Sequence, residues 1–147
     1  MRVYILSRNK DLYSTKRLVE EAEAKGWEVR VIDYLKCTIE IMKGELVVNY
    51  EGKVLPIPDA IIPRIGASRT FYGTAMVRHF EMLDVFSTVG NLALTRSRDK
   101  LRSLQVLSKN DVDMPRTVFA SNKSNAKDVI ALSGGAPLVL KILEGTQ

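Results

Sequence analysis

Short β-type segments alternate with amphipathic helical stretches along the chain, and this alternation constrains the fold more than any other feature. Residues 2–7, 28–33 and 60–65 predict strands. Between the first two strands, Ser14 is expected to cap a helix that runs to residue 25, and after the third strand a helix runs from Thr70 to about residue 84. Strands and helices in this order predict an open α/β sheet rather than a helical bundle.

Within residues 1–90 the sequence also predicts a hairpin and the buried face of the second helix. Residues 38–41 and 46–50, on either side of Lys43-Gly44, predict a β-hairpin. Helical spacing favours a packed histidine at His79 over a ligand. The same spacing predicts that the helix from Thr70 buries Phe71, Ala75, Phe80 and Leu83.

A boundary near Gly90-Asn91 divides the chain into an α/β domain over residues 1–90 and a second part over residues 91–147. The second part is predicted to begin with a helix of roughly twenty residues, with Ser97 as its N-cap and Asp99 in its first turn. This part is too short to close a hydrophobic core of its own.

The chain is predicted to end in two strands, at residues 116–120 and 137–143, with a short helix capped by Ser124 between them. A lysine, Lys141, lies in the middle of the last apolar strand, which is costly unless an anion meets the ammonium group. Gly145-Thr146 then suits a turn whose backbone N–H groups hold a phosphate.

Composition bounds the class of protein. Hydrophobic residues make up 46% of the 147 residues, which is ample for a core, and no apolar run reaches the roughly 20 residues that span a membrane. The single cysteine, Cys37, excludes an internal disulfide framework, and with no signal-peptide pattern at Met1 it favours a reducing cytoplasm. The net charge of +5 favours anionic partners of any kind.

Two loops at the ends of predicted strands carry candidate ligand contacts. Residues 7–14 contain no glycine, which argues against a dinucleotide-binding turn, and Ser7 and Arg8 are either ligand contacts or solvated loop residues. Arg64 and Arg69 follow the third strand, and arginine side chains grip carboxylates or phosphates in a bidentate way. A salt bridge between domains or a plain surface loop is the alternative for this arginine pair.

A basic run covers residues 95–102, where Lys100 could reach an anion across a cleft, although a solvated helix face is the usual explanation of such a run. Cys37 has neither a second cysteine nor a nearby histidine, so metal binding and thiol catalysis both lack support. No carboxylate cluster suited to Mg²⁺ is apparent in the sequence.

Taken together, these segments resemble the RimK-type α-L-glutamate ligases of the ATP-grasp superfamily over the whole chain. The resemblance implies a Rossmann-like pre-ATP-grasp sheet followed by the beginning of an ATP-grasp subdomain. It rests on Tyr4-Ile-Leu-Ser-Arg8, Leu12-Tyr-Ser14, Lys16-Arg-Leu18, Ile62-Pro-Arg-Ile-Gly66, Thr70-Phe-Tyr-Gly-Thr74, Arg98-Asp-Lys-Leu-Arg102 and Gly134-Gly-Ala-Pro-Leu-Val-Leu-Lys141.

The resemblance also implies an activity and its cofactors. In this family ATP phosphorylates a carboxylate, and an amine attacks the acyl phosphate; the RimK-type activity adds glutamate to the C-terminal tail of a small-subunit ribosomal protein. Lys100 and Lys141 match the lysines that line the ATP phosphates, and Gly145 and Thr146 match the start of the mobile glycine-rich loop. The Mg²⁺ or Mn²⁺ ligands and the catalytic residues are expected beyond residue 147, so this chain alone is expected to be inactive.

Two rival functions stay open. One is another ATP-grasp carboxylate–amine ligase with a different acceptor. The other is a non-catalytic module whose basic run contacts RNA or an acidic tail. On the interpretation as the first part of a ligase, the apolar edge left by residues 116–143 predicts pairing with a second copy, and hence a homo-oligomer, or disorder of that region.

Overall fold

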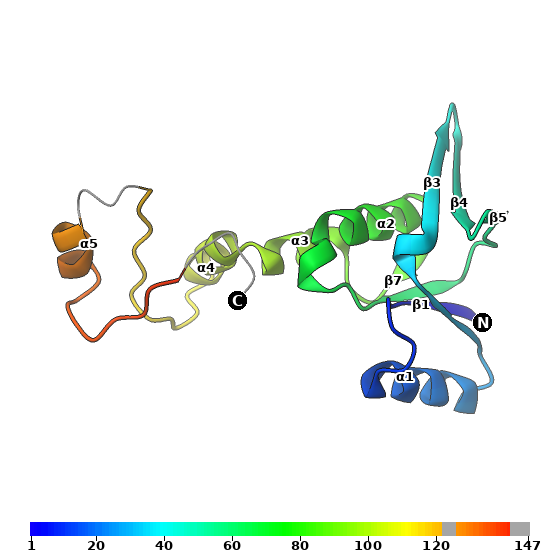
Figure 1. Cartoon of the computed structure of the whole chain (residues 1–147), viewed down its shortest axis with the longest axis horizontal. Coiled ribbons are helices and arrows are strands. Elements are labelled where there is room, and N and C mark those ends of the chain that lie inside the picture. The colour runs from blue at the N-terminus through cyan, green and yellow to red at the C-terminus, as the bar shows by residue number, and fades with distance from the viewer. Residues whose placement is uncertain (122–125, 142–147) are drawn as a thin grey trace. The chain divides into compact units, whose positions relative to one another are not determined.

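The computed structural model describes residues 1–121 and 126–141, and the chain forms two compact units, Met1–Thr95 and Arg96–Gln147. Figure 1 shows the helices and strands of both units. The first unit holds all the strands of the described residues, and the second holds helices joined by irregular segments.

A four-stranded parallel sheet organises the first unit. Its strands are β1 (Arg2–Leu6), β2 (Glu28–Ile32), β6 (Ala60–Pro63) and β7 (Phe86–Ser87), in the order β2-β1-β6-β7. The two inner strands are largely buried, as expected of parallel strands covered on both faces. The predicted open α/β sheet and its three main strands are therefore confirmed.

Two helices connect these parallel strands. The helix α1 (Tyr13–Ala24) leads from β1 out to β2, and α2 (Thr70–Met82) leads from β6 out to β7 in the opposite direction. Because crossovers of this kind are right-handed, the two helices lie on opposite faces of the sheet (Figure 1). Both helices consequently begin at the same edge of the sheet, where the strands have their carboxyl ends.

The predicted N-cap of the first helix is wrong. Leu12 occupies the N-cap position of α1, with an extended backbone and no side-chain cap, while Ser14 lies inside the first turn. The Ser14 hydroxyl instead accepts a hydrogen bond from the Nη2 of Arg64, 2.9 Å away. At the other end, Gly26 adopts a φ of 72° just after the helix and so stops it.

A β-hairpin projects from the first unit, as predicted. A 3₁₀ turn, η1 (Tyr34–Lys36), leads into β3 (Cys37–Met42), which pairs antiparallel with β4 (Glu45–Tyr50), and the short β5 (Lys53–Val54) extends this sheet. The hydroxyl of Tyr72 on α2 donates to the carbonyl of Cys37 at 2.6 Å, which fixes the base of the hairpin to that helix.

The core lies between the parallel sheet, α2 and the hairpin. It includes Tyr4, Ile61, Met76 and Phe80. Phe71, predicted to be buried, is 89% exposed, so that prediction is wrong. The inward face of α2 follows positions 73, 76, 77 and 80, and position 71 lies off this face. Phe80 is buried as predicted, and Ala75 and Leu83 are half-buried.

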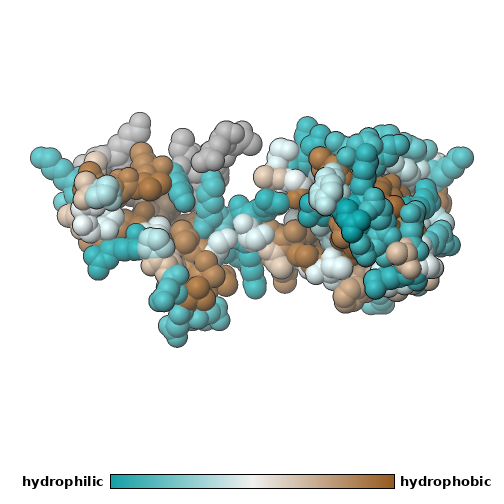
Figure 2. Space-filling view, turned by 90° about the horizontal axis from the view of Figure 1, so that it is seen from below, coloured by the Kyte–Doolittle hydropathy of each residue, from teal (hydrophilic) through white to brown (hydrophobic). Residues whose placement is uncertain are grey.

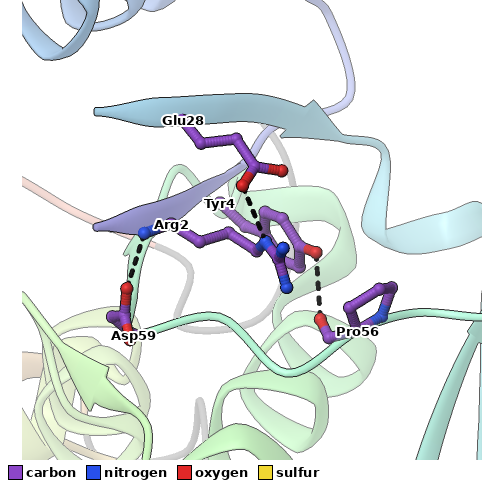
Figure 3. A network of polar contacts seen from close by, with 5 residues as sticks. All are labelled: Arg2, Tyr4, Glu28, Pro56 and Asp59. Atoms are coloured by element: carbon purple, nitrogen blue, oxygen red, sulfur yellow. Dashed lines mark hydrogen bonds and ion pairs between the residues drawn. The ribbon is translucent and has the colours of Figure 1, made fainter. Parts of the chain in front are cut away.

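The amino ends of the strands are tied together by polar contacts (Figure 3). The Nε of Arg2 donates to a carboxylate oxygen of Glu28 at 3.1 Å, which joins β1 to β2. The backbone N–H of Arg2 donates to Asp59 at 2.6 Å, and the Tyr4 hydroxyl donates to the Pro56 carbonyl at 2.9 Å. The segment before β6 is thereby held against β1.

The predicted long helix after residue 90 is two helices, α3 (Asn91–Arg98) and α4 (Lys100–Lys109). Asp99 separates them because its backbone is extended, and its carboxylate accepts from the N–H of Arg102 at 2.9 Å. Asp99 is therefore the N-cap of α4, and the prediction of Ser97 as the cap of one continuous helix is wrong. The prediction placed Asp99 two residues inside the helix, whereas Asp99 is itself the cap.

The predicted strands of the second unit are also wrong for the described residues. Residues 116–120 and 137–141 pair with no strand, and residues 142 and 143 lie outside the described part. An extended segment becomes a strand only when its backbone forms hydrogen bonds with a neighbouring strand. No described segment pairs with residues 116–120 or 137–141 in this way. The helix α5 (Ala126–Leu132) lies between them, followed by Gly134 at a φ of 100°; its predicted cap, Ser124, is outside the described residues.

The second unit leaves many apolar side chains at its surface (Figure 2). None of the described residues of α4 or α5 is buried, and Leu140 is 91% exposed. This agrees with the expectation that the part is too short to close its own core. No helix in the described ranges combines the length and apolar composition needed to cross a membrane.

Candidate functional site

The carboxyl edge of the parallel sheet contains a topological switch point between β1 and β6. From β1 the chain leaves through α1 to one side of the sheet, and from β6 it leaves through α2 to the other. Open α/β sheets bind ligands outside the carboxyl ends of strands at such a point. The backbone N–H of Arg64 donates to the carbonyl of Leu6 at 2.9 Å, so the ends of the two strands stay together.

Arg64 is the best-anchored cation at this edge. It follows directly after β6, its side chain is exposed, and its Nη2 donates to the hydroxyl of Ser14 in the first turn of α1. One nitrogen of the guanidinium is thus held in place while the remaining N–H groups stay available. A planar fork held in this way can bind a carboxylate or phosphate with two hydrogen bonds.

Arg69 and Arg8 lie at the same edge. Arg69 ends the short 3₁₀ turn η2 (Ala67–Arg69) and occupies the N-cap position of α2, and Arg8 follows β1 by two residues. All three arginines at this edge are exposed, and within the described residues no carboxylate lies within ion-pair distance of any of them. The sequence-predicted pair, Arg64 and Arg69, therefore shares the carboxyl edge with Arg8.

Ser7 is not a solvated loop residue. It is buried, and its hydroxyl donates to the carbonyl of Asn9 at 3.1 Å and lies 3.3 Å from the hydroxyl of Thr15. The side chain of Asn9 in turn accepts from the N–H of Asp11 at 2.8 Å. Side-chain hydrogen bonds thus order this loop, in which glycine is absent.

The two lysines expected to bind ATP lie in the second unit. Lys100 is the first residue of α4 and directly follows the capping Asp99, and Lys141 is exposed at the end of an unpaired segment. The strand that was expected to hold Lys141 is absent from the described residues. Their contact with ATP stays a prediction, and Gly145 and Thr146 lie outside the described part.

The buried titratable groups of the first unit are structural. Burial raises the pKa of Cys37 to about 12, so this thiol does not ionise near neutral pH. Burial also lowers the pKa of His79, whose ring packs in the core as predicted. Across residues 1–121 and 126–141, no group of three His, Cys, Asp or Glu side chains could hold a metal ion.

Sequence reasoning missed three residues at the carboxyl edge. Ser14 was interpreted as a helix cap, yet it anchors Arg64. Tyr13 and Phe71 are 79% and 89% exposed in the first turns of α1 and α2. A stricter use of helical periodicity would have placed Phe71 outside the buried face, but the contact between Ser14 and Arg64 joins residues 50 positions apart and has no local signal.

Family models match both parts of the chain. One described as the RimK PreATP-grasp domain matches residues 1–94, and one described as the RimK-like ATP-grasp domain matches residues 97–147. Among curated proteins, a probable alpha-L-glutamate ligase of Psychromonas ingrahamii is 55% identical and one of Shewanella loihica is 57% identical, each over 147 residues. Each alignment covers 100% of this chain and 49% of the relative, so the chain spans about half the length of the curated relatives it matches.

Solved structures share the fold. The macrocyclase MdnB from Microcystis aeruginosa MRC superposes with a TM-score of 0.65 at 17% identity, over 89% of this chain and 58% of that one. The ATP-grasp ligase PsnB, complexed with a minimal precursor, gives a TM-score of 0.61 at 16% identity, over 92% of this chain and 54% of that one. At such low identity the likeness concerns the fold alone.

Proposed function

The chain belongs to the RimK family, and from this premise we propose that it forms the N-terminal part of an ATP-dependent glutamate ligase. The acceptor is the C-terminal carboxylate of a small-subunit ribosomal protein, and the reaction passes through an acyl phosphate. The observation that carries this proposal is the match over all 147 residues to probable alpha-L-glutamate ligases at 55–57% identity.

The division of labour follows the two parts of the chain. Residues 1–90 form the pre-ATP-grasp domain, and residues 91–147 form a linking helix and the first portion of the ATP-grasp domain. Lys100 and Lys141 bind the phosphates of ATP, because ammonium groups neutralise the charge that moves during phosphoryl transfer. ATP supplies the phosphoryl group that activates the acceptor carboxylate.

The divalent metal is a separate matter. ATP-grasp chemistry uses Mg²⁺ or Mn²⁺, but the described residues offer no cluster of acidic or histidine side chains that fits either ion. No step at the metal is therefore assigned to this part of the protein. We expect the 147-residue chain by itself to release no phosphate from ATP, since it spans half of its relatives.

The acceptor is bound at the carboxyl edge of the first unit. Arg64 and Arg69 are exposed there without a carboxylate partner among the described residues, and Ser14 orients Arg64. Guanidinium groups match the geometry of carboxylates, which a ribosomal protein tail extended by glutamate carries in number. The composition, with one buried cysteine, is consistent with a cytoplasmic protein of this kind.

A chimera tests the proposal. Residues 1–147 of this chain replace the matching half of the Shewanella loihica relative, and the product is incubated with ATP, glutamate and a peptide copy of the ribosomal protein tail. We expect phosphate release that requires both glutamate and peptide, together with peptide products heavier by whole glutamate residues. Phosphate release with unrelated carboxylates but not with the tail peptide would instead indicate an ATP-grasp ligase that acts on a different acceptor.

A further inference from the structure

Two aromatic rings stand exposed beside the arginines of the carboxyl edge. Tyr13 is the first residue of α1 and Phe71 the second residue of α2, and they are 79% and 89% exposed. The two helices begin at this edge on opposite faces of the sheet (Figure 1). The rings therefore lie at the same edge of the sheet as Arg8, Arg64 and Arg69.

The two kinds of side chain call for a ligand with two kinds of group. Covering an exposed aromatic ring with an apolar group is favourable, and so is pairing a guanidinium group that has no carboxylate partner with a carboxylate. The amino edge differs, since Arg2 is paired with Glu28 there. Charge complementarity with the arginines therefore requires an anionic ligand at the carboxyl edge. The exposed rings require that the same ligand also carries an apolar group.

We propose that this edge binds an extended peptide segment in which acidic residues flank an apolar or aromatic side chain. The apolar side chain packs on one of the two exposed rings, Tyr13 or Phe71, and Arg8, Arg64 and Arg69 contact the carboxylates. The inference rests on the proposed function, because such a segment is the part of the acceptor that precedes the reacting carboxylate. The inference adds to the proposed function a preference for an apolar residue in the acceptor tail, because a tail of glutamates alone offers nothing to cover the rings.

A single-stranded nucleic acid also offers anions and flat rings, but the site fits it less well. Platforms for successive bases carry their aromatic rings along one groove, whereas Tyr13 and Phe71 are on helices that cover opposite faces of the sheet. Nucleic-acid binding also depends on a strongly basic surface, and Met1–Thr95 carries nearly equal numbers of cationic and anionic residues.

Fluorescence anisotropy of labelled peptides, without ATP, tests the inference on the whole 147-residue chain. The probes are Glu-Glu-Phe-Glu-Glu, Glu-Glu-Ser-Glu-Glu and an oligouridylate of five nucleotides. We expect the phenylalanine peptide to bind about three- to tenfold more tightly than the serine peptide, which is the size of one aromatic contact. The oligouridylate is expected to bind more weakly than both.

Substitutions separate the two halves of the site. The double variant Phe71→Ser with Tyr13→Ser should abolish the preference for phenylalanine while leaving the affinity for the serine peptide unaffected. Arg64→Gln should weaken both peptides about fivefold and flatten the salt dependence, as expected for an exposed ion pair. Phe86 and Arg78 are exposed elsewhere on the first unit and provide matched controls. Phe86→Ser and Arg78→Gln should change the affinity for neither peptide.

Each result bears on the inference separately from the ligase reaction. Equal affinity for the two peptides, a preference that survives Phe71→Ser and Tyr13→Ser, or no peptide binding at all would overturn it. Tighter binding of the oligouridylate, lost in the same variants, would assign the edge to nucleic acid instead. Peptide binding as expected, in a chain whose chimera adds no glutamate, would refute the ligase proposal and leave the peptide site standing.

Discussion

Replacing Gly73 with alanine is expected to destabilise the first unit, although alanine is the better helix former. Gly73 lies in the interior of α2, where a β-carbon would penetrate far inside van der Waals contact with the Cγ2 of Ile65. The same β-carbon would lie 3.0 Å from the Cδ1 and 3.1 Å from the Cγ1 of that side chain. Ile65 is buried and directly follows Arg64, so the clash falls on the segment that carries the candidate site.

Two opposing effects set the magnitude. Alanine in place of glycine inside a helix stabilises a protein by about 0.5–1 kcal/mol. Overpacking of a filled core costs about 1–3 kcal/mol. The nearest atom is a branch at the β-carbon of Ile65, whose rotamer is stiff, so the clash cannot be relieved by rotating the end of the side chain. We therefore expect overpacking to prevail and the free energy of unfolding to fall by about 1–2 kcal/mol.

Urea unfolding measured by tryptophan fluorescence suits this test, because Trp27 is the only tryptophan and lies in the first unit. The control is the same substitution in an Ile65→Leu background, which removes the Cγ2 branch and keeps the volume. There, Gly73→Ala should be neutral or stabilising. An equal loss in both backgrounds, or a gain in the original chain, would refute the reasoning.

Four further outcomes are expected. Because burial lowers the pKa of His79 below its usual 6.5, the unfolded chain takes up the proton first, and the free energy of unfolding should fall as the pH drops through about 6.5; His79→Gln should flatten this dependence in pH-dependent urea titrations. Cys37, with a pKa of about 12, should react slowly with thiol alkylating reagents in the folded chain and quickly in urea. In the chimeric ligase, Lys141→Ala should weaken ATP use about tenfold and Lys141→Arg should restore it only in part, and unchanged kinetics in both would remove Lys141 from the site. Ser14→Ala should weaken peptide binding less than Arg64→Gln does, and should have no effect once Arg64 is already replaced.

The sequence predicted the first unit well because its signals are local. The two inner strands, at residues 2–7 and 60–65, are mostly apolar, and the strand at residues 28–33 alternates charged with apolar residues. Gly26 stops α1 where a left-handed conformation is needed. The hairpin likewise follows from alternation around a glycine turn. Each of these elements is decided by residues close to one another in the chain.

Phe71 and the cap at Asp99 were errors in local patterns, and the other errors arise where distant residues decide the structure. Residues 116–120 have a β-type composition, but a strand also requires a partner with free hydrogen-bonding groups, and the described residues provide none. Ser14 has the chemistry of a cap, yet the contact from Arg64 uses its hydroxyl in another way. Of the candidate site, the sequence predicted the arginines by type, and only the order of the strands shows which of them share an edge.

The arginines near the two ends of β1 have different surroundings. Arg2, at its amino end, is paired with Glu28 and, through its backbone, with Asp59, so its charge is compensated within the unit. Arg8, just past its carboxyl end, lies at the edge where Arg64 is held by a neutral hydroxyl instead of a carboxylate. A carboxylate partner would compete with an anionic ligand, whereas a serine orients the guanidinium and leaves its charge available. Under the proposed function, a hydroxyl in place of an acid is therefore what an acceptor-binding edge requires, and Ser14 then connects the first turn of α1 to that binding.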